Sequence, residues 1–122
     1  MALLCLAACS SVSSEEQAAK AARSYYVHLL DDRPAEFLDG KVGADSLPDA
    51  YRAQLIQTYN QYMADMVSKY GGLTDVAVSP NIGRRDTSIH VTYAFLLLSF
   101  RDSTQEEIAV PMVEVDGEWR MK

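Results

Sequence analysis

Apolar residues recur every three or four positions after Ser13, which indicates an amphipathic helix. Ser13 stands three residues before Glu16, the spacing of a capping box at a helix N-terminus. Pro34 disfavours helical geometry in the residue before it, so we expect the helix to end near Asp31 and Asp32. The predicted buried face comprises Ala18, Ala22, Tyr25, Tyr26, Leu29 and Leu30.

A second amphipathic pattern follows a short segment, residues 35–39, that we expect to form one further helical turn. The long helix is predicted to open at residues 46–49, with Pro48 in its first turn, where the missing N–H is harmless. Gly71 and Gly72 supply a left-handed helix end. Its apolar face is predicted to comprise Tyr51, Leu55, Tyr59, Tyr62, Met63, Met66, Val67 and Tyr70.

After Gly72 the pattern changes to the alternation of β-strands. We expect a short strand over residues 74–78 that ends in a turn at 79–81, then a long strand over 87–101 that is apolar on both faces through 94–98. In the strand over 107–115 the alternating apolar residues are Ile108 and Val110 before Pro111, but Val113 and Val115 after it. This one-residue shift in the alternation predicts a β-bulge at Pro111. Asp116-Gly117 predicts a hairpin, with Trp119 and Met121 facing inward in the last strand.

Helices followed by antiparallel strands indicate an α+β domain, in which the helices pack on one face of a curved sheet of about four strands. We expect a single domain over residues 15–122, because a chain of 122 residues is short for two cores.

The first nine residues have the pattern of an export signal. Residues 1–8 are uncharged and end in small side chains, and Leu6-Ala7-Ala8-Cys9 resembles the lipobox of bacterial lipoproteins. This resemblance implies a signal remnant over 1–8, lipidation of Cys9, and a Ser-rich tether over 9–14. It predicts a lipid-anchored protein of the bacterial cell envelope, at the periplasmic side or in the outer membrane. The alternative is an apolar N-terminal helix.

Charge and composition exclude several functions. The net charge is −6 and the longest basic run is Arg84-Arg85, so a nucleic-acid partner is not expected. Apart from Cys5 and Cys9 the chain has no cysteine, and it has two histidines, so we expect no disulfide, no metal site and no cofactor. Its 48% hydrophobic residues are ordinary for a globular domain.

Several segments together carry a resemblance: Tyr25-Tyr26 and Leu29-Leu30 on a capped helix, Phe37-Leu38, a Tyr-rich second helix and the terminal hairpin from Val115 to Met121. The domain resembles the nuclear transport factor 2-like, or cystatin-like, α+β roll, and in particular small bacterial lipoproteins of unknown function with that fold. The resemblance implies a cone-shaped sheet whose mouth can admit a ligand and an outer sheet face that can form a homodimer. Dehydratases and isomerases occur among the relatives, so fold alone does not assign an activity.

Two histidines and an aspartate are the weak catalytic candidates. His28 precedes Asp31 and Asp32 at helical spacing, so a carboxylate could raise its basicity. A histidine near a helix C-terminus is also favoured by the helix dipole alone. His90 is predicted to lie in the long strand, where it could face Asp65 or His28 across a cavity, or simply be a satisfied structural histidine.

Tyrosines are the candidates for binding. A buried tyrosine seeks a partner for its hydroxyl, so a cluster can line a pocket that is apolar in body and polar at a few points. The alternative is an ordinary aromatic core. The pocket candidates are Tyr25, Tyr26, Tyr59, Tyr62, Met66, His90 and Tyr93.

Three functions remain open at this point. The first is a lipid-anchored, non-enzymatic module that binds a small apolar ligand or an envelope protein. The second is a dehydratase-like or isomerase-like enzyme that uses a cavity histidine and a carboxylate. The third is a structural domain that dimerises.

Overall fold

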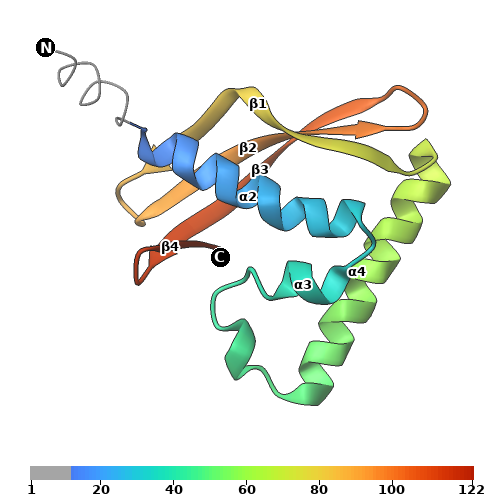
Figure 1. The fold of residues 1–122 in the computed structure, drawn as a ribbon, viewed down its shortest axis with the longest axis horizontal. Helices are drawn as coiled ribbons and strands as arrows, with labels where there is room; N and C mark the ends of the chain where they lie inside the picture. The colour runs from blue at the N-terminus through green and yellow to red at the C-terminus, as the bar shows by residue number, and fades with distance from the viewer. Residues whose placement is uncertain (1–11) are drawn as a thin grey trace, which may run out of the picture.

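The computed structural model describes residues 12–122, so the expected signal remnant over 1–8 and the lipidation site Cys9 lie outside the described residues. Within residues 12–122, three helices and a short 3-10 turn precede four strands (Figure 1). In chain order the elements are α2 (Ser14–Leu30), α3 (Pro34–Leu38), η1 (Ala44–Ser46), α4 (Asp49–Tyr70), β1 (Leu73–Asp86), β2 (Val91–Phe100), β3 (Gln105–Val115) and β4 (Glu118–Met121).

The first helix begins and ends where the sequence predicts. The Ser13 hydroxyl accepts a hydrogen bond of 3.1 Å from the Glu16 backbone N–H, which caps α2. Ser14, assigned to the tether from the sequence, is the first residue of the helix. The chain leaves α2 through Asp32, whose φ of 60° is left-handed, and Pro34 then starts α3.

The long helix α4 is the least buried of the helices. Pro48, predicted to lie in the first turn, is instead the N-cap, so the helix begins at Asp49. Its C-cap is Gly71, with a φ of 84°. Met66 is the buried residue of this 22-residue helix, whereas Tyr51, Tyr62 and Val67 of the predicted apolar face are exposed. The reason is placement: α4 lies across the end of the sheet where β1 begins, so it contacts little of the sheet (Figure 1).

The four strands form one antiparallel sheet in the order β1-β2-β3-β4. The predicted end of the first strand at residues 79–81 is wrong, because β1 continues to Asp86. Its pairing with β2 shifts between Val78 and Gly83, which makes residues 79–82 a bulge. The Ser79 hydroxyl accepts from the Asn81 N–H at 3.1 Å, so the local turn chemistry is used inside the strand.

The turn between β1 and β2 occupies residues 87–90, which the sequence analysis assigned to the long strand. The Asp86 carboxylate accepts from the Ser88 N–H at 3.1 Å and from its hydroxyl at 2.6 Å, and these bonds stabilise the turn. His90 therefore lies in a turn with a φ of 55°, not in the strand.

The predicted bulge at Pro111 is also wrong. The register between β2 and β3 runs without a shift from Thr92↔Met112 to Ser99↔Gln105. The alternating residues of β3 that face the core continue at Met112 rather than at Val113, and Met112 is fully buried. The hairpin at Asp116-Gly117 is confirmed, with φ values of 52° and 81°, and Met121 is buried as predicted.

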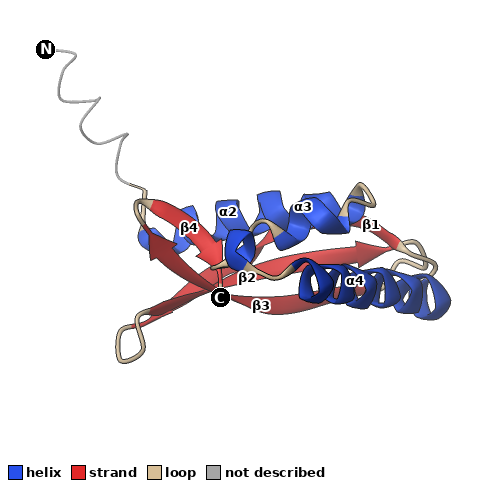
Figure 2. Ribbon diagram, turned by 90° about the horizontal axis from the view of Figure 1, so that it is seen from below, coloured by secondary structure: helices blue, strands red, loops and turns tan. Residues whose placement is uncertain are grey.

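The two faces of the sheet have different surroundings. The inner face is the one covered by α2, and Figure 2 shows α2 and α3 together on this side of the sheet. The buried inner-face residues of β2 are Thr92, Ala94, Leu96, Leu98 and Phe100. All of them except Thr92 belong to one hydrophobic cluster with Ala18, Ala22 and Leu29 of α2. The other side, the outer face, carries the half-buried Tyr93, Phe95 and Leu97. The α+β arrangement predicted from the sequence is confirmed.

Candidate functional site

His28 pairs with a different carboxylate from the two that the sequence suggested. Its Nδ1 atom lies 3.3 Å from a carboxylate oxygen of Glu36 on α3, while Asp31 and Asp32 are exposed beyond the end of α2. Glu36 also lies 3.5 Å from Arg33. The His28 and Glu36 side chains remain 34% and 49% exposed, so this pair lies at the surface rather than in a cavity.

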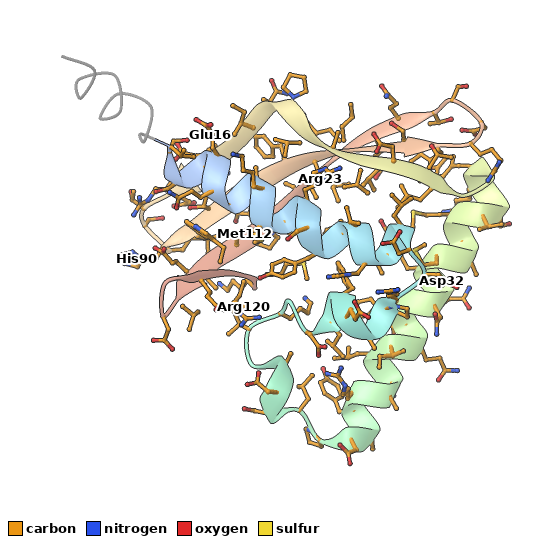
Figure 3. All side chains as sticks on the ribbon, in the orientation of Figure 1. Glu16, Arg23, Asp32, His90, Met112 and Arg120 are labelled. Atoms are coloured by element: carbon orange, nitrogen blue, oxygen red, sulfur yellow. The ribbon has the colours of Figure 1, made fainter. Side chains whose placement is uncertain are left out.

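His90 and Asp65 are far apart, because they lie near opposite ends of β2. His90 directly precedes the first residue of β2, whereas Asp65 lines a hollow with Phe100, the last. Nine residue steps of a strand span about 30 Å. Figure 3 shows His90 below the start of α2, and Asp32, just past His28, at the other end of that helix. The proposed cavity pairing of His90 with Asp65 or His28 is therefore wrong.

Two of the predicted pocket tyrosines pack around Phe37. Tyr26 and Tyr59 contact the Phe37 ring edge-to-face, with centroid distances of 5.0 Å and 4.9 Å. Burial raises the pKa of the Tyr26 hydroxyl above its usual range, and the nearby Tyr62 and Tyr59 hydroxyls raise it further. These rings fill the space between α2, α3 and α4 instead of lining an open pocket.

Tyr62 and Met66 border a shallow hollow of about 200 Å³ between α4 and the inner face. Phe100 forms part of its floor, and Glu106 stands at its rim. Burial, followed by the Glu106 charge, raises the pKa of Tyr62. Asp65 accepts a hydrogen bond of 2.9 Å from the Gln61 side chain, so its carboxylate is engaged within its own helix.

Tyr25 and Tyr93 lie elsewhere. The Tyr25 hydroxyl donates to the Trp119 carbonyl at 2.5 Å, so this tyrosine joins α2 to β4. Tyr93 lies on the outer face, where the Arg84 guanidinium sits 5.2 Å from the centre of its ring. The structure thus distributes the seven predicted pocket residues over several separate places.

The outer face carries an apolar row along β2. Tyr93, Phe95 and Leu97 stand on it, with the apolar neighbours Pro111, Ala109 and Ala77 across the strands. Two charged residues also pair with the row, Arg84 with Tyr93 and Glu107 with Leu97. None of the three β2 side chains packs against the helix-covered core, and no helix of residues 12–122 covers this face. The sequence signal for it was the run of apolar residues on both strand faces over 94–98.

A polar cluster borders this row. The Glu107 carboxylate accepts hydrogen bonds from the Ser79 hydroxyl and, at 2.9 Å, from the Asn81 side-chain amide. The Ser79 bond, followed by the Asn81 bond, holds the pKa of Glu107 below its usual value. Sequence analysis missed this cluster because the bulge in β1 brings Ser79 and Asn81 to Glu107.

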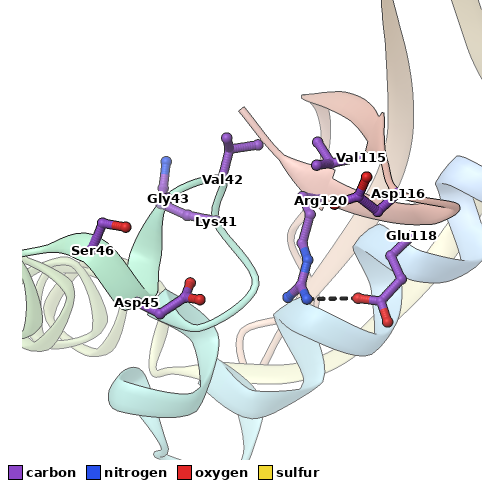
Figure 4. A pocket seen from close by; sticks show the side chains of 9 residues that line it. All are labelled: Lys41, Val42, Gly43, Asp45, Ser46, Val115, Asp116, Glu118 and Arg120. Carbon is purple, nitrogen blue, oxygen red and sulfur yellow. Dashed lines mark hydrogen bonds and ion pairs between the residues drawn. The ribbon is translucent and has the colours of Figure 1, made fainter.

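A charged groove of about 430 Å³ lies between residues 41–46 and the β3–β4 hairpin (Figure 4). Its cations have internal partners: Arg120 lies 2.6 Å from the Glu118 carboxylate and donates to the Asp39 carbonyl at 3.1 Å. The Lys41 amine donates to the Lys122 carbonyl at 3.2 Å. The groove is therefore an internally paired polar surface.

Two negative findings concern membranes and metals. Within residues 12–122, none of the helices combines the length and the apolar character needed to cross a bilayer. In the same part of the chain, no three histidine, cysteine, aspartate or glutamate side chains gather in a way that could hold a metal ion.

Comparison of the sequence with known protein families and with characterised proteins gives no match. Among solved structures, the fold is similar to that of a candidate nuclear transport factor 2-like transpeptidase from Campylobacter jejuni, with a TM-score of 0.61. The two sequences are 12% identical over the match, which covers 82% of this chain and 92% of that one. The chain therefore has the nuclear transport factor 2-like fold expected from the sequence, a fold that suits a ligand-binding or an enzyme-like domain.

Proposed function

We propose that this protein is a non-catalytic binding domain of the bacterial cell envelope, held at the membrane by lipid on Cys9, that pairs with a second copy of itself through the outer face of its sheet. The observation that carries this proposal is the apolar row Tyr93, Phe95 and Leu97, which stands on a face that no helix of the described chain covers.

The area of the outer face is compatible with binding of a second copy of the chain. With strands about 4.8 Å apart and a rise of about 3.3 Å per residue, four strands and the ten residues of β2 span about 600 Å². A stable interface buries about 800 Å² on each partner, so flanking side chains would supply the remainder. Aromatic residues at the centre of such a patch, here Tyr93 and Phe95, are typical of the residues that dominate binding energy.

The enzyme alternatives have less support. General base catalysis needs a histidine and a carboxylate within hydrogen-bonding reach of a bound substrate. The His28–Glu36 pair lines neither of the hollows described above. His90 borders a third hollow together with Glu114, but no hydrogen bond or ion pair joins His90 to a carboxylate among residues 12–122. Acyl transfer as in a transpeptidase needs an activated nucleophile, but Ser79 is 2% exposed and bonded to Glu107.

The proposal is tested by the oligomeric state of the wild-type protein and of a Phe95→Glu variant, measured by sedimentation. We expect a wild-type dimer whose dissociation constant rises at least about 100-fold in the variant, because the interface would bury an unpaired carboxylate. Val67→Glu is the matched control, since Val67 is a 60% exposed apolar residue on α4, away from the outer face. A monomeric wild type, or a Phe95→Glu dimer of undiminished strength, would overturn the proposal.

A further inference from the structure

A third hollow lies on the inner side of the sheet, at the end where α2 starts. This hollow, which we call the N-terminal pocket, has a volume of about 170 Å³ and lies beside the β1–β2 turn. Figure 3 places His90 at this end, below the first turn of α2. Its lining residues are Ser14, Arg85, His90, Thr92, Glu114 and Trp119.

The hydroxyl of Thr92 borders the N-terminal pocket without a side-chain hydrogen bond to residues 12–122. Thr92 is 4% exposed. Buried hydroxyls are normally hydrogen-bonded. In this part of the chain, every side-chain polar atom that is fully excluded from solvent has a hydrogen-bond partner. Because the Thr92 hydroxyl has no such partner, it is not fully excluded from solvent and opens to the pocket that it lines.

Opposite charges border the same pocket. Arg84 and Arg85 alternate across β1: Arg84 stacks on Tyr93 at the outer face, whereas Arg85 pairs with Thr92 and lines the pocket. Glu114 of β3 also lines it. Neither Arg85 nor Glu114 forms an ion pair within residues 12–122, so each leaves a charge available to a ligand.

Trp119 forms one wall of the pocket and is held in place. Its indole N–H donates to the Gln17 side chain at 3.3 Å, and its carbonyl accepts from the Tyr25 hydroxyl. These bonds fix the indole beside the pocket. Because Trp119 is the single tryptophan of the chain, all tryptophan fluorescence comes from this residue, whose surroundings include the pocket.

We propose that the N-terminal pocket binds a small zwitterion of the α-amino-acid class. The ligand carboxylate contacts Arg85, with His90 beside it, the ammonium group contacts Glu114, and the Thr92 hydroxyl bonds to either group. The volume of about 170 Å³ is enough for a ligand as small as alanine. A simple anion or cation would contact one of the two charged side chains, whereas a zwitterion contacts both. This inference is independent of the outer-face dimer.

The affinity should be modest, because Arg85 and Glu114 are exposed and a small ligand makes few contacts. A dissociation constant on the order of 1 mM is expected. The test is titration of the full chain with alanine, followed by Trp119 fluorescence and by the backbone amide NMR shifts of residues around the pocket. Acetate and ethylammonium, each carrying one of the two charges, are titrated in parallel.

We expect saturable binding of alanine and at least about tenfold weaker binding of acetate and of ethylammonium. Arg85→Ala and Glu114→Gln should each weaken alanine binding at least about tenfold. Arg84→Ala is the matched control, since it removes an adjacent arginine that points to the opposite face, and it should change the affinity less than about twofold. Thermal unfolding of each variant verifies that it is folded.

Three results would overturn the inference. The first is the absence of any saturable change in both fluorescence and NMR shifts with alanine. The second is equal binding of acetate and alanine, which would show an anion site. The third is an equal loss in the Arg84→Ala and Arg85→Ala variants, which would show a general effect of surface charge.

Discussion

The ring of Tyr25 occupies the space that a side chain at position 40 would need. A Cβ atom built on Gly40 would come within 2.5 Å of the Tyr25 ring, closer than such atoms approach in folded proteins. The Gly40 carbonyl accepts from the Met121 N–H at 2.8 Å, and the Tyr25 hydroxyl bonds to the Trp119 carbonyl. Tyr25 and Gly40 therefore fasten the segment after α3 and strand β4 to helix α2.

Gly40→Ala should lower the free energy of unfolding by about 1–3 kcal/mol, because the added methyl group overpacks a closed site. Urea unfolding followed by circular dichroism measures the change. In a Tyr25→Leu background the same substitution should cost much less, and the double-mutant cycle gives the coupling. Additive effects of the two changes would contradict the contact.

The Glu107 cluster predicts a dependence of stability on acid pH. Hydrogen bonds from Ser79 and Asn81 hold the pKa of Glu107 below its ordinary value of 4.5, so the folded carboxylate stays charged to lower pH than the unfolded one. The stability from these bonds is present above pH 4.5 and is lost as the pH falls through the folded-state pKa. Glu107→Gln should flatten the loss of unfolding free energy below pH 4.5. The flattening should be partial, since the pKa values of Asp86 and Asp102 are also lowered.

A second variant isolates the cause of the Glu107 shift. Ser79→Ala removes the largest contribution, so the pKa of Glu107 should move up towards 4.5, as measured by NMR titration of its side-chain carboxyl carbon. An unchanged titration midpoint in this variant would be inconsistent with the hydrogen bond as the cause.

Tyr26 predicts a dependence of stability on alkaline pH. Burial raises the pKa of its hydroxyl above the ordinary value of 10.0, so above pH 10 the unfolded chain loses this proton while the folded protein keeps it. The free energy of unfolding should therefore fall as the pH rises beyond 10. Tyr26→Phe, which keeps the edge-to-face contact with Phe37, should reduce that fall. Alkaline urea unfolding measures it, and an identical pH profile for the two proteins would refute the prediction.

Lipidation of Cys9 is tested in the bacterial host. The wild-type protein should sediment with membranes and incorporate a fatty-acid label, whereas Cys9→Ser should lose the label and become soluble. Cys5→Ser is the matched control, because Cys5 belongs to the expected signal remnant and should leave both properties unchanged. A wild-type protein without the label would remove the lipid anchor from the proposed function.

Local signals accounted for the element types and several of their ends. Ser13 and Glu16 cap α2, Gly71 ends α4, and Asp116-Gly117 forms the last hairpin, as predicted. Each of these features depends on bonds or backbone conformations within a few residues, and such preferences hold in whatever fold surrounds them. The α+β class followed from the order of these elements.

The errors and the sites depended on long-range pairing instead. Residues 79–81 have turn chemistry, but cross-strand bonds to β2 resume at Gly83 and convert the turn into a bulge. The same register moves the turn to residues 87–90, which takes His90 out of the strand and separates it from Asp65. It also decides that Arg84 and Arg85 face opposite sides. The local sequence therefore determined the ends of the helices and the last hairpin, whereas strand register, which sums bonds between distant residues, decided which side chains meet.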